Sequence, residues 1–246
     1  MNWRFLKFER YDPFFKTGLN DALSESVRET GIPVVFLAGW SKKTVNVGRS
    51  QSIEERVSLG KCEDDDITVV RRQGGGGTTF LTPEGEITWG LVAPDEYFPD
   101  DVNQIYREKC GLIADAVEKL GIDARHEPVN DVVTENGKIS GSTIRRKDGV
   151  TYFGGTLLYK SNPKEMFRYI KPGDDKKKGK HIENFKERVS SVSKESEASF
   201  EESQEALRSK LLEGKNWEIS ELTEGEIGRA RSLGNKYRGR EWLYRE

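Results

Sequence analysis

Alternating apolar and polar positions predict two strands on either side of a glycine run in the first half of the chain. The strands cover positions 67–70 and 87–91, and four consecutive glycines at 74–77 lie between them. Glycine costs up to roughly 1 kcal/mol of backbone entropy relative to alanine, so a glycine run indicates that something approaches the backbone closely. We therefore predict a strand, a glycine loop and a strand built around residues 71–80.

Arg71 and Arg72 stand at the mouth of this loop and favour an anionic ligand such as a phosphate or a carboxylate. A mobile hairpin without a ligand is the alternative. No Gly-Lys-Ser/Thr sequence follows the glycines and no helix is predicted to open after them. The loop is therefore neither a P-loop nor a dinucleotide-binding fingerprint.

Helical periodicity predicts two long helices. One begins behind Asp12-Pro13, and the other extends from about residue 103 to residue 120 with Cys110 on its apolar stripe, as a core residue. Two capping boxes predict shorter helices nearer the end of the chain: Ser199 with Glu202, and Thr223 with Glu226.

The dipeptide Asn136-Gly137 is a strong signal for a two-residue β-hairpin. The turn pairs the strand at 132–133 with a strand that begins at Lys138, and this pairing brings Lys138 close to Asp131. Asp148-Gly149 predicts a second hairpin. Hairpins interleaved with helices predict an α+β domain.

Composition excludes several classes of protein. Lys and Arg total 40 against 42 Asp and Glu, so no net field recruits nucleic acid or a membrane. No apolar run approaches the roughly 20 residues that span a bilayer. Cys62 and Cys110 form neither a disulfide framework nor a zinc motif. We expect a cytoplasmic protein with one domain over residues 1–246 and a helical C-terminal segment from about 199 to 246.

Seven motifs stand in order along the chain: Tyr11-Asp12-Pro13-x-Phe15, Gly48-Arg49-Ser50-Gln51, Arg71-Arg72-x-x-Gly75-Gly76-Gly77, Asn130-Asp131, Gly137-Lys138-Ile139-Ser140-Gly141-Ser142, Gly155-Thr156-Leu157-Leu158 and Glu187-Arg188-Val189. Together they resemble the lipoate-protein ligase family, from about residue 3 to the end. Many ligases of this family carry a C-terminal accessory domain, and the resemblance implies that this chain corresponds to the catalytic domain, with no C-terminal accessory domain. The resemblance implies the fold of biotin- and lipoate-protein ligase catalytic domains, a mixed, largely antiparallel sheet flanked by helices. It also implies an ATP- and magnesium-dependent enzyme that converts lipoate or octanoate to an acyl-adenylate.

In the reaction that this resemblance implies, the acyl group passes to a lysine of a lipoyl-domain protein, such as a 2-oxoacid dehydrogenase E2 or a glycine cleavage H protein. Lys138 matches the lysine that holds ATP and the lipoyl carboxylate, and Asp131 is a candidate for binding magnesium or orienting the amine. The lysine-rich segment 171–180 falls where the family has a loop that folds over the adenylate. The positions matched to nucleotide or lipoyl binding are Arg72, Gly75, Gly76, Gly77, Thr78, Thr79, Phe80, Asn130, Lys138, Gly155 and Thr156.

Two departures from the family pattern put substrate contacts in doubt. Leu81-Thr82 replaces a usual His-Asp, and Phe153-Gly154 replaces a common His-His. The main rival is an ATP-independent octanoyltransferase, whose similar relatives carry a cysteine upstream of the Gly-Lys-x-x-Gly-Ser stretch. Residues 125–131 contain no cysteine, which favours a ligase. A noncatalytic acyl-binding subunit and a ligase completed by a separate accessory subunit are further alternatives.

Overall fold

The computed structural model describes residues 2–171 and 189–245, and within these residues an eight-stranded sheet forms the centre of the molecule. Across the sheet its strands are β11 (Trp217–Ser220), β1 (Trp3–Tyr11), β2 (Val34–Trp40), β6 (Glu86–Pro94), β10 (Val150–Leu158), β9 (Gly137–Lys147), β8 (Asp131–Thr134) and β7 (Arg125–Glu127). The pairs β11–β1 and β1–β2 are parallel, and every other neighbouring pair is antiparallel. The predicted mixed, largely antiparallel sheet is confirmed.

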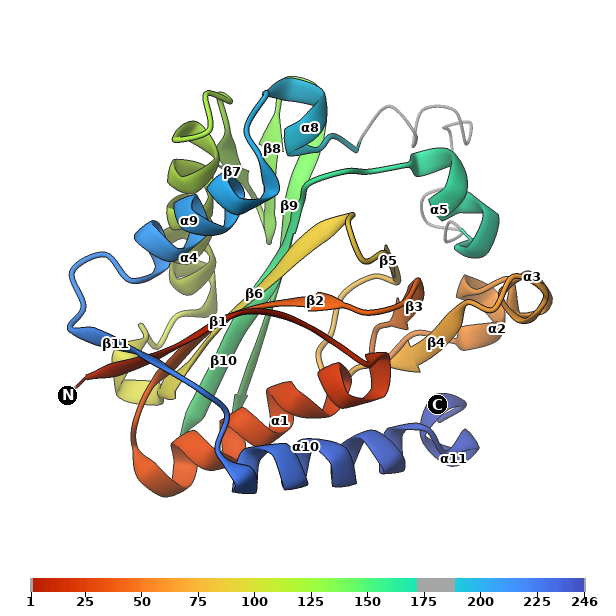
Figure 1. The fold of residues 1–246 in the computed structure, drawn as a ribbon, viewed down its shortest axis with the longest axis horizontal. Coiled ribbons are helices and arrows are strands. Elements are labelled where there is room, and N and C mark those ends of the chain that lie inside the picture. Colours follow the sequence, from red (N-terminus) through yellow and green to blue (C-terminus); the bar gives the residue numbers. More distant parts are fainter. Residues whose placement is uncertain (1, 172–188, 246) are drawn as a thin grey trace.

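Two pairs of helices cover this sheet (Figure 1). Helices α4 (Val102–Glu118) and α9 (Phe200–Leu211) pack on one face, where Cys110 is fully buried as predicted. Helices α1 (Pro13–Thr30) and α10 (Glu224–Tyr237) pack against each other and cover part of the other face.

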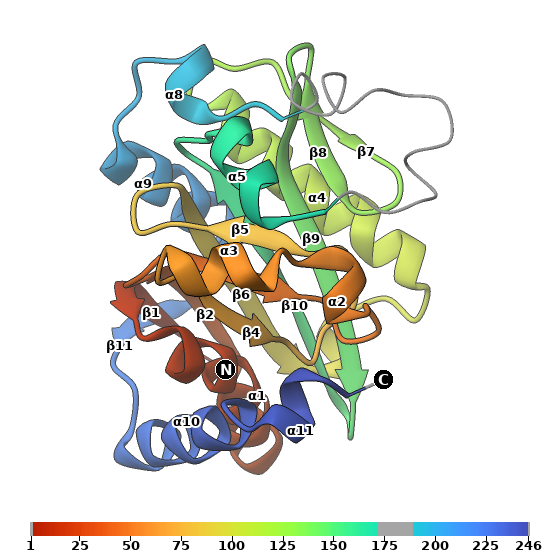
Figure 2. The same cartoon turned by 90° about the vertical axis from the view of Figure 1, so that its right-hand side faces the viewer.

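A second, three-stranded sheet stands beside the large one among the described residues, with the strand order β4 (Thr68–Arg71), β3 (Thr44–Val47) and β5 (Thr79–Leu81). Figure 2 shows it in front of the large sheet, above α1 and α10. The short helices α2 (Ile53–Arg56), α3 (Leu59–Asp64) and α5 (Pro163–Tyr169) flank it. The other short elements of the described residues are a 3-10 helix (Asp95–Tyr97), α8 (Val192–Glu195) and α11 (Arg240–Leu243).

The predicted strands around the glycine loop are present, but they belong to different sheets. β4 pairs with β3 in the small sheet, whereas β6 lies in the large one. The glycine loop therefore connects two layers, with the short strand β5, which was not predicted, between them.

Local signals set the ends of several elements as predicted. The Asp12 carboxylate caps α1 by accepting hydrogen bonds from the next helical amides, and both predicted capping boxes are formed. Asp148 and Gly149 have φ values of 52° and 77°, which suit the tight turn between β9 and β10. The C-terminal segment also contains a strand, β11, besides its helices.

Candidate active site

The β8–β9 hairpin brings Lys138 and Asp131 into direct contact. Lys138 Nζ lies 2.5 Å from Asp131 Oδ1, and the two side chains are 40% and 33% exposed. Gly137 supplies the turn with a φ of 122°, a conformation that favours glycine. The proximity predicted from Asn136-Gly137 is confirmed, and the pair is accessible to a substrate.

Gly141 makes room for the lysine. A Cβ on Gly141 would lie 2.6 Å from Lys138 Nζ and 3.5 Å from Asp131 Oδ1. The ion pair therefore lies directly over the bare backbone of β9. The next strand also comes close here, because a Cβ on Gly155 would lie 2.4 Å from the Gly141 carbonyl oxygen. Thr156 stands opposite Gly141 in β10.

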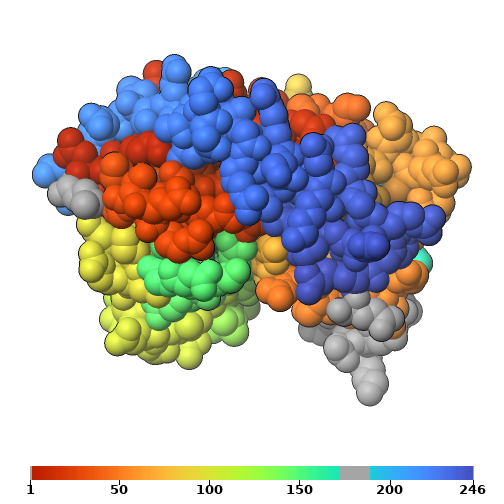
Figure 3. Space-filling model, turned by 90° about the horizontal axis from the view of Figure 1, so that it is seen from below, coloured from red at the N-terminus to blue at the C-terminus, as the bar shows by residue number. Residues whose placement is uncertain are grey.

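The glycine loop lies on the same face of β9 as the ion pair. A Cβ on Gly74 would meet the Thr143 hydroxyl at 3.3 Å. Residues 141 and 143 of a regular strand point to the same side, so Lys138 and the glycine loop share one face of the large sheet. The surface is hollowed when the molecule is seen from below (Figure 3). One side of the hollow is the yellow and green part of the chain, which includes α4 and the β9–β10 turn. The other side is the orange part near residue 50.

Arg72 organises the glycine loop from within. Its guanidinium donates to the carbonyl oxygens of Gly75 at 2.8 Å and 3.2 Å, Gly77 at 2.7 Å and Asn46 at 3.0 Å. Burial lowers the pKa of Arg72 to about 10, so the group is still cationic at neutral pH. These four hydrogen bonds direct the guanidinium to carbonyl groups of the protein. Its predicted contact with a nucleotide stays a prediction.

The other loop residues form two groups. Gly76 has a φ of 90° and its carbonyl oxygen would meet a Cβ on Gly48 at 2.0 Å, so the Gly48–Gln51 segment packs directly on the loop. No atom lies within 4 Å of the Cβ positions of Gly75 and Gly77, so these two positions are open.

After the glycines, Thr79 and Phe80 belong to β5 of the small sheet, and Thr78 lies just before it. The Thr78 hydroxyl donates to Gln51 Oε1 at 2.7 Å. Thr79 pairs with Asn46 across β5 and β3, and the Phe80 ring stacks on Tyr169 of α5 at 5.1 Å. Their roles in ligand binding stay predictions.

Asn130 fixes the start of β8 beside Asp131. Its Nδ2 donates to the Ser142 carbonyl at 2.6 Å, and its own carbonyl accepts from the Ser142 amide at 2.8 Å. This residue therefore holds β8 against β9 at the level of the ion pair.

Arg71 was not predicted to have a structural role, but it is fully buried and ties three segments together. Its guanidinium donates to the carbonyls of Gly48, Arg49 and Gln51, and to that of Leu243 at 2.8 Å. Trp242 Nε1 donates in turn to the Arg71 carbonyl at 2.9 Å. Its position at the end of an apolar strand is the only sequence signal for this burial.

Glu195 in α8 is another residue that sequence reasoning missed. Its carboxylate accepts hydrogen bonds from the Thr134 hydroxyl at 2.8 Å, from Asn136 Nδ2 at 3.1 Å and from the Ser190 hydroxyl. The Ser190 amide donates to the Lys138 carbonyl at 2.9 Å. Glu195 thus supports the turn of the hairpin that carries both members of the ion pair.

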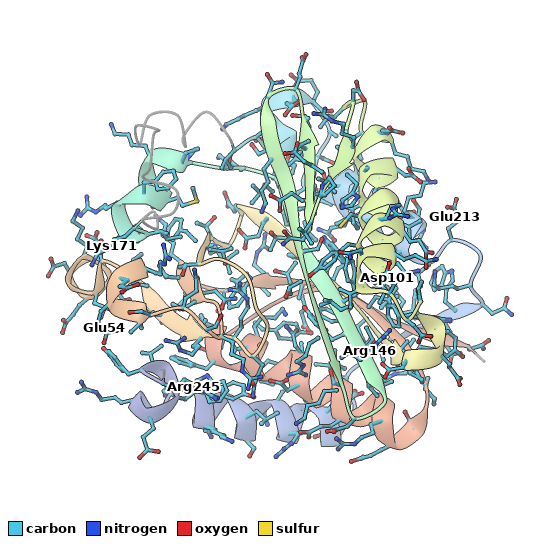
Figure 4. The ribbon with its side chains drawn as sticks, turned by 180° about the vertical axis from the view of Figure 1, so that it is seen from behind. Glu54, Asp101, Arg146, Lys171, Glu213 and Arg245 are labelled. Atoms are coloured by element: carbon cyan, nitrogen blue, oxygen red, sulfur yellow. The ribbon has the colours of Figure 1, made fainter. Side chains whose placement is uncertain are left out.

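The lysine-rich segment predicted at 171–180 lies outside the described residues apart from Lys171. Lys171 Nζ donates to the Glu54 carbonyl at 2.9 Å, and Figure 4 shows the two residues side by side. At the other end of the gap, Val189 forms a β-bridge with Lys138.

The first residue in each of the two departures from the family pattern is buried. Leu81 is buried beside Trp40 and Val70, and Phe153 is fully buried in the core of the large sheet. The chain therefore uses these two positions for packing.

Asp131 as a magnesium ligand stays a prediction. The carboxylate oxygen Oδ1 already contacts the cationic Lys138 ammonium. No group of three or more His, Cys, Asp and Glu side chains that could hold a metal is found in the part of the chain that the structure describes.

Comparison with known proteins identifies the family. The model of the lipoyl protein ligase A/B catalytic domain matches residues 12–212, and the chain belongs to this family. A bi-partite lipoate protein ligase of known structure from Thermoplasma acidophilum, described with its E2 lipoyl domain, superimposes with a TM-score of 0.87 at 24% identity, over 99% of this chain and 96% of that one. At this identity the similarity establishes the fold.

The sequence relatives correct the predicted activity. The octanoyltransferase LipM of Staphylococcus aureus is 26% identical over 99% of both chains. The lipoate-protein ligase A of Psychrobacter cryohalolentis is 28% identical, but the match covers 78% of this chain and 54% of that protein. The sequence similarity that covers nearly the full length of both chains is thus to octanoyltransferases. The prediction of an ATP-dependent lipoate-protein ligase was wrong. The absence of cysteine from residues 125–131 therefore does not indicate a ligase.

None of the helices in the described ranges is long and apolar enough to cross a bilayer.

Proposed function

We propose that this chain is an octanoyltransferase that moves an octanoyl group from a carrier-protein thioester to a lysine of a lipoyl-domain acceptor, without ATP. The near full-length similarity to octanoyltransferases supports the reaction type. The observation that carries the proposal within this chain is the accessible Lys138–Asp131 pair, held over the bare backbone of Gly141.

The chemistry requires a cation near the reacting carbonyl. When an amine attacks a thioester, negative charge develops on the carbonyl oxygen, and a fixed ammonium group stabilises that charge. Losing one such preorganised contact typically costs on the order of 3 kcal/mol of barrier. Lys138 supplies the ammonium group, and Asp131 keeps it in place through the 2.5 Å contact.

The acceptor must present a neutral amine. With a free pKa near 10.4, only about one lysine in a few thousand is neutral at pH 7. A cation beside the amine favours its neutral form, and so does removal from water. An acceptor lysine next to Lys138 therefore meets an environment that promotes its reaction.

A lipoyl domain is the proposed acceptor, because the similar structure from Thermoplasma acidophilum is a lipoate protein ligase that is described together with its E2 lipoyl domain. This chemistry needs neither a nucleotide nor a metal ion. The involvement of a separate accessory subunit stays a prediction.

The test is a transfer assay with purified chain, octanoyl carrier protein and a lipoyl domain, followed by intact mass spectrometry of the acceptor. We expect the acceptor to gain one octanoyl group in the absence of ATP and magnesium. An acceptor that gains mass only with free octanoate or lipoate plus ATP would refute the proposal, and one that never gains mass would support a noncatalytic binding role.

A further inference from the structure

We infer that this chain passes the acyl group directly from the donor thioester to the acceptor amine within one ternary complex, with no acyl-cysteine intermediate. The inference rests on the proposed function and concerns the path of the acyl group. It starts from the two cysteines of the 246-residue sequence, Cys62 and Cys110, and from the place of each relative to Lys138.

Cys110 lies on the wrong side of the sheet. Its Sγ contacts the Ser142 hydroxyl at 3.5 Å, on the face of β9 that α4 covers. The Lys138 ammonium lies over Gly141, the preceding residue, and neighbouring residues of a strand point to opposite faces. The backbone of β9 therefore separates the thiol from the ammonium group, and the thiol is fully buried.

Cys62 is equally unsuited. It is 2% exposed and belongs to α3, where it packs in an apolar cluster with Val45 of β3 and Ile67, the residue before β4. Burial raises the pKa of both thiols to about 11, so both are protonated at neutral pH and neither is an activated nucleophile.

The segment before β8 offers no replacement thiol. Residues 125–131 contain His126 and no cysteine, and the His126 ring nitrogen Nε2 lies 3.1 Å from the Val129 carbonyl oxygen. Among the described residues, the ammonium of Lys138 and the carboxylate of Asp131 are accessible at the centre of the site, and they suit stabilisation of charge and orientation.

A direct transfer balances without any further reactant. The acceptor amine nitrogen forms a bond to the thioester carbonyl carbon, and the carbon–sulfur bond then breaks. The sulfur leaves with the bonding electrons and takes up the proton that the amine loses, so the products are an amide and a free thiol. Lys138 stabilises the oxyanion between these two steps, and both substrates must be bound together.

Two measurements test the inference. The first is the intact mass of the wild-type chain after incubation with octanoyl carrier protein alone. The second is the initial rate of transfer by wild type and by the Cys62→Ala, Cys110→Ala double variant, over a grid of donor and acceptor concentrations.

We expect no octanoyl adduct on the chain, intersecting double-reciprocal lines, and transfer that survives in the double variant. An octanoyl adduct on the wild-type chain, or parallel lines, would overturn the inference even if the double variant proved too unstable to assay. If wild type transferred no octanoyl group from the thioester, the proposed function would fail and the inference with it. Transfer through an adduct would leave the proposed function intact and remove only the inference.

Discussion

The Lys138 ammonium group occupies the space that a side chain at Gly141 would fill, since a Cβ there would lie 2.6 Å from Nζ. The two residues are three positions apart on one strand, so the lysine folds back over its own backbone. Glycine at 141 is therefore required for the position of the ammonium group. A side chain there would displace the end of the lysine and leave the backbone of the fold in place.

Gly141→Ala should displace the ammonium group without unfolding the chain, because the atom that must move is the flexible end of a lysine. A displacement of about 1 Å at a reacting centre can reduce the rate about 100-fold. We expect a loss of that order in kcat/KM for octanoyl transfer, with little change in the melting temperature. Wild-type rates in this variant would show that the position of Lys138 is not critical.

Gly155→Ala is the contrasting substitution, in which the backbone itself must move. Its Cβ would lie 2.4 Å from the Gly141 carbonyl oxygen, which is backbone and cannot move freely. We expect this variant to lose stability by roughly 1 to 3 kcal/mol, because overpacking forces the backbone to shift.

Lys138→Ala and Asp131→Asn should impair octanoyl transfer and leave the stability of the fold nearly unchanged. Exposed ion pairs contribute about 0 to 1 kcal/mol, so both variants should unfold close to the wild-type temperature. The rate of transfer should fall about 100-fold in Lys138→Ala, because the group that stabilises the oxyanion is gone. Lys194→Ala, which removes an exposed lysine from the neighbouring α8, is the control and should retain its activity.

Glu195→Ala should loosen the hairpin that carries the ion pair, since Thr134, Asn136 and Ser190 lose their common acceptor. Each lost hydrogen bond destabilises the hairpin by about 1 kcal/mol. We therefore expect amide exchange to accelerate at residues 134–138 and kcat to fall about tenfold. Glu195→Gln keeps one acceptor oxygen and should recover part of the activity. The exposed Glu197 is the control position, and an equal loss on Glu197→Ala would contradict this role.

Lys16 gives the fold a pH dependence. It is 1% exposed, its Nζ donates to Asn20 Oδ1 at 3.0 Å, and burial lowers its pKa from 10.5 to about 7. Between these two pH values the unfolded chain binds the proton and the folded chain does not, so stability rises with pH across this window. The penalty is largest at pH 7 and below.

Lys16→Met should therefore stabilise the chain at pH 7, on the order of 2 to 4 kcal/mol, and by much less at pH 10. Chemical denaturation at the two pH values measures the difference. Lys147→Met changes a lysine with a 71% exposed side chain and should have little effect at either pH. A stability gain for Lys16→Met that is equal at pH 7 and pH 10 would contradict the account of its titration.

The features predicted from sequence are those that a few neighbouring residues determine. Asn136-Gly137 sets a turn by itself, and this turn was enough to bring Asp131 and Lys138 together. The capping box of Ser199 and Glu202 is likewise complete within four positions.

The missed features depend on contacts between distant segments. Arg71 meets the Leu243 carbonyl across 172 positions, and Glu195 meets Thr134 across 61. No local pattern encodes these contacts, nor does one reveal that β4 and β6 belong to different sheets.

The activity was mispredicted for a chemical reason. A lysine over a glycine-rich strand suits acyl-adenylate and thioester chemistry alike, because both develop negative charge beside a carbonyl carbon. The motif around Lys138 therefore identified the family and left the acyl donor undetermined.

The most direct test of the central claim compares two acyl donors under matched conditions, with a lipoyl domain as acceptor and its intact mass as the measurement. One reaction contains octanoyl carrier protein and no nucleotide, and the other contains free octanoate, ATP and magnesium. The account predicts octanoylated acceptor in the first reaction, at a rate that Lys138→Ala reduces about 100-fold, and none in the second. Octanoylated acceptor in the second reaction alone would contradict it.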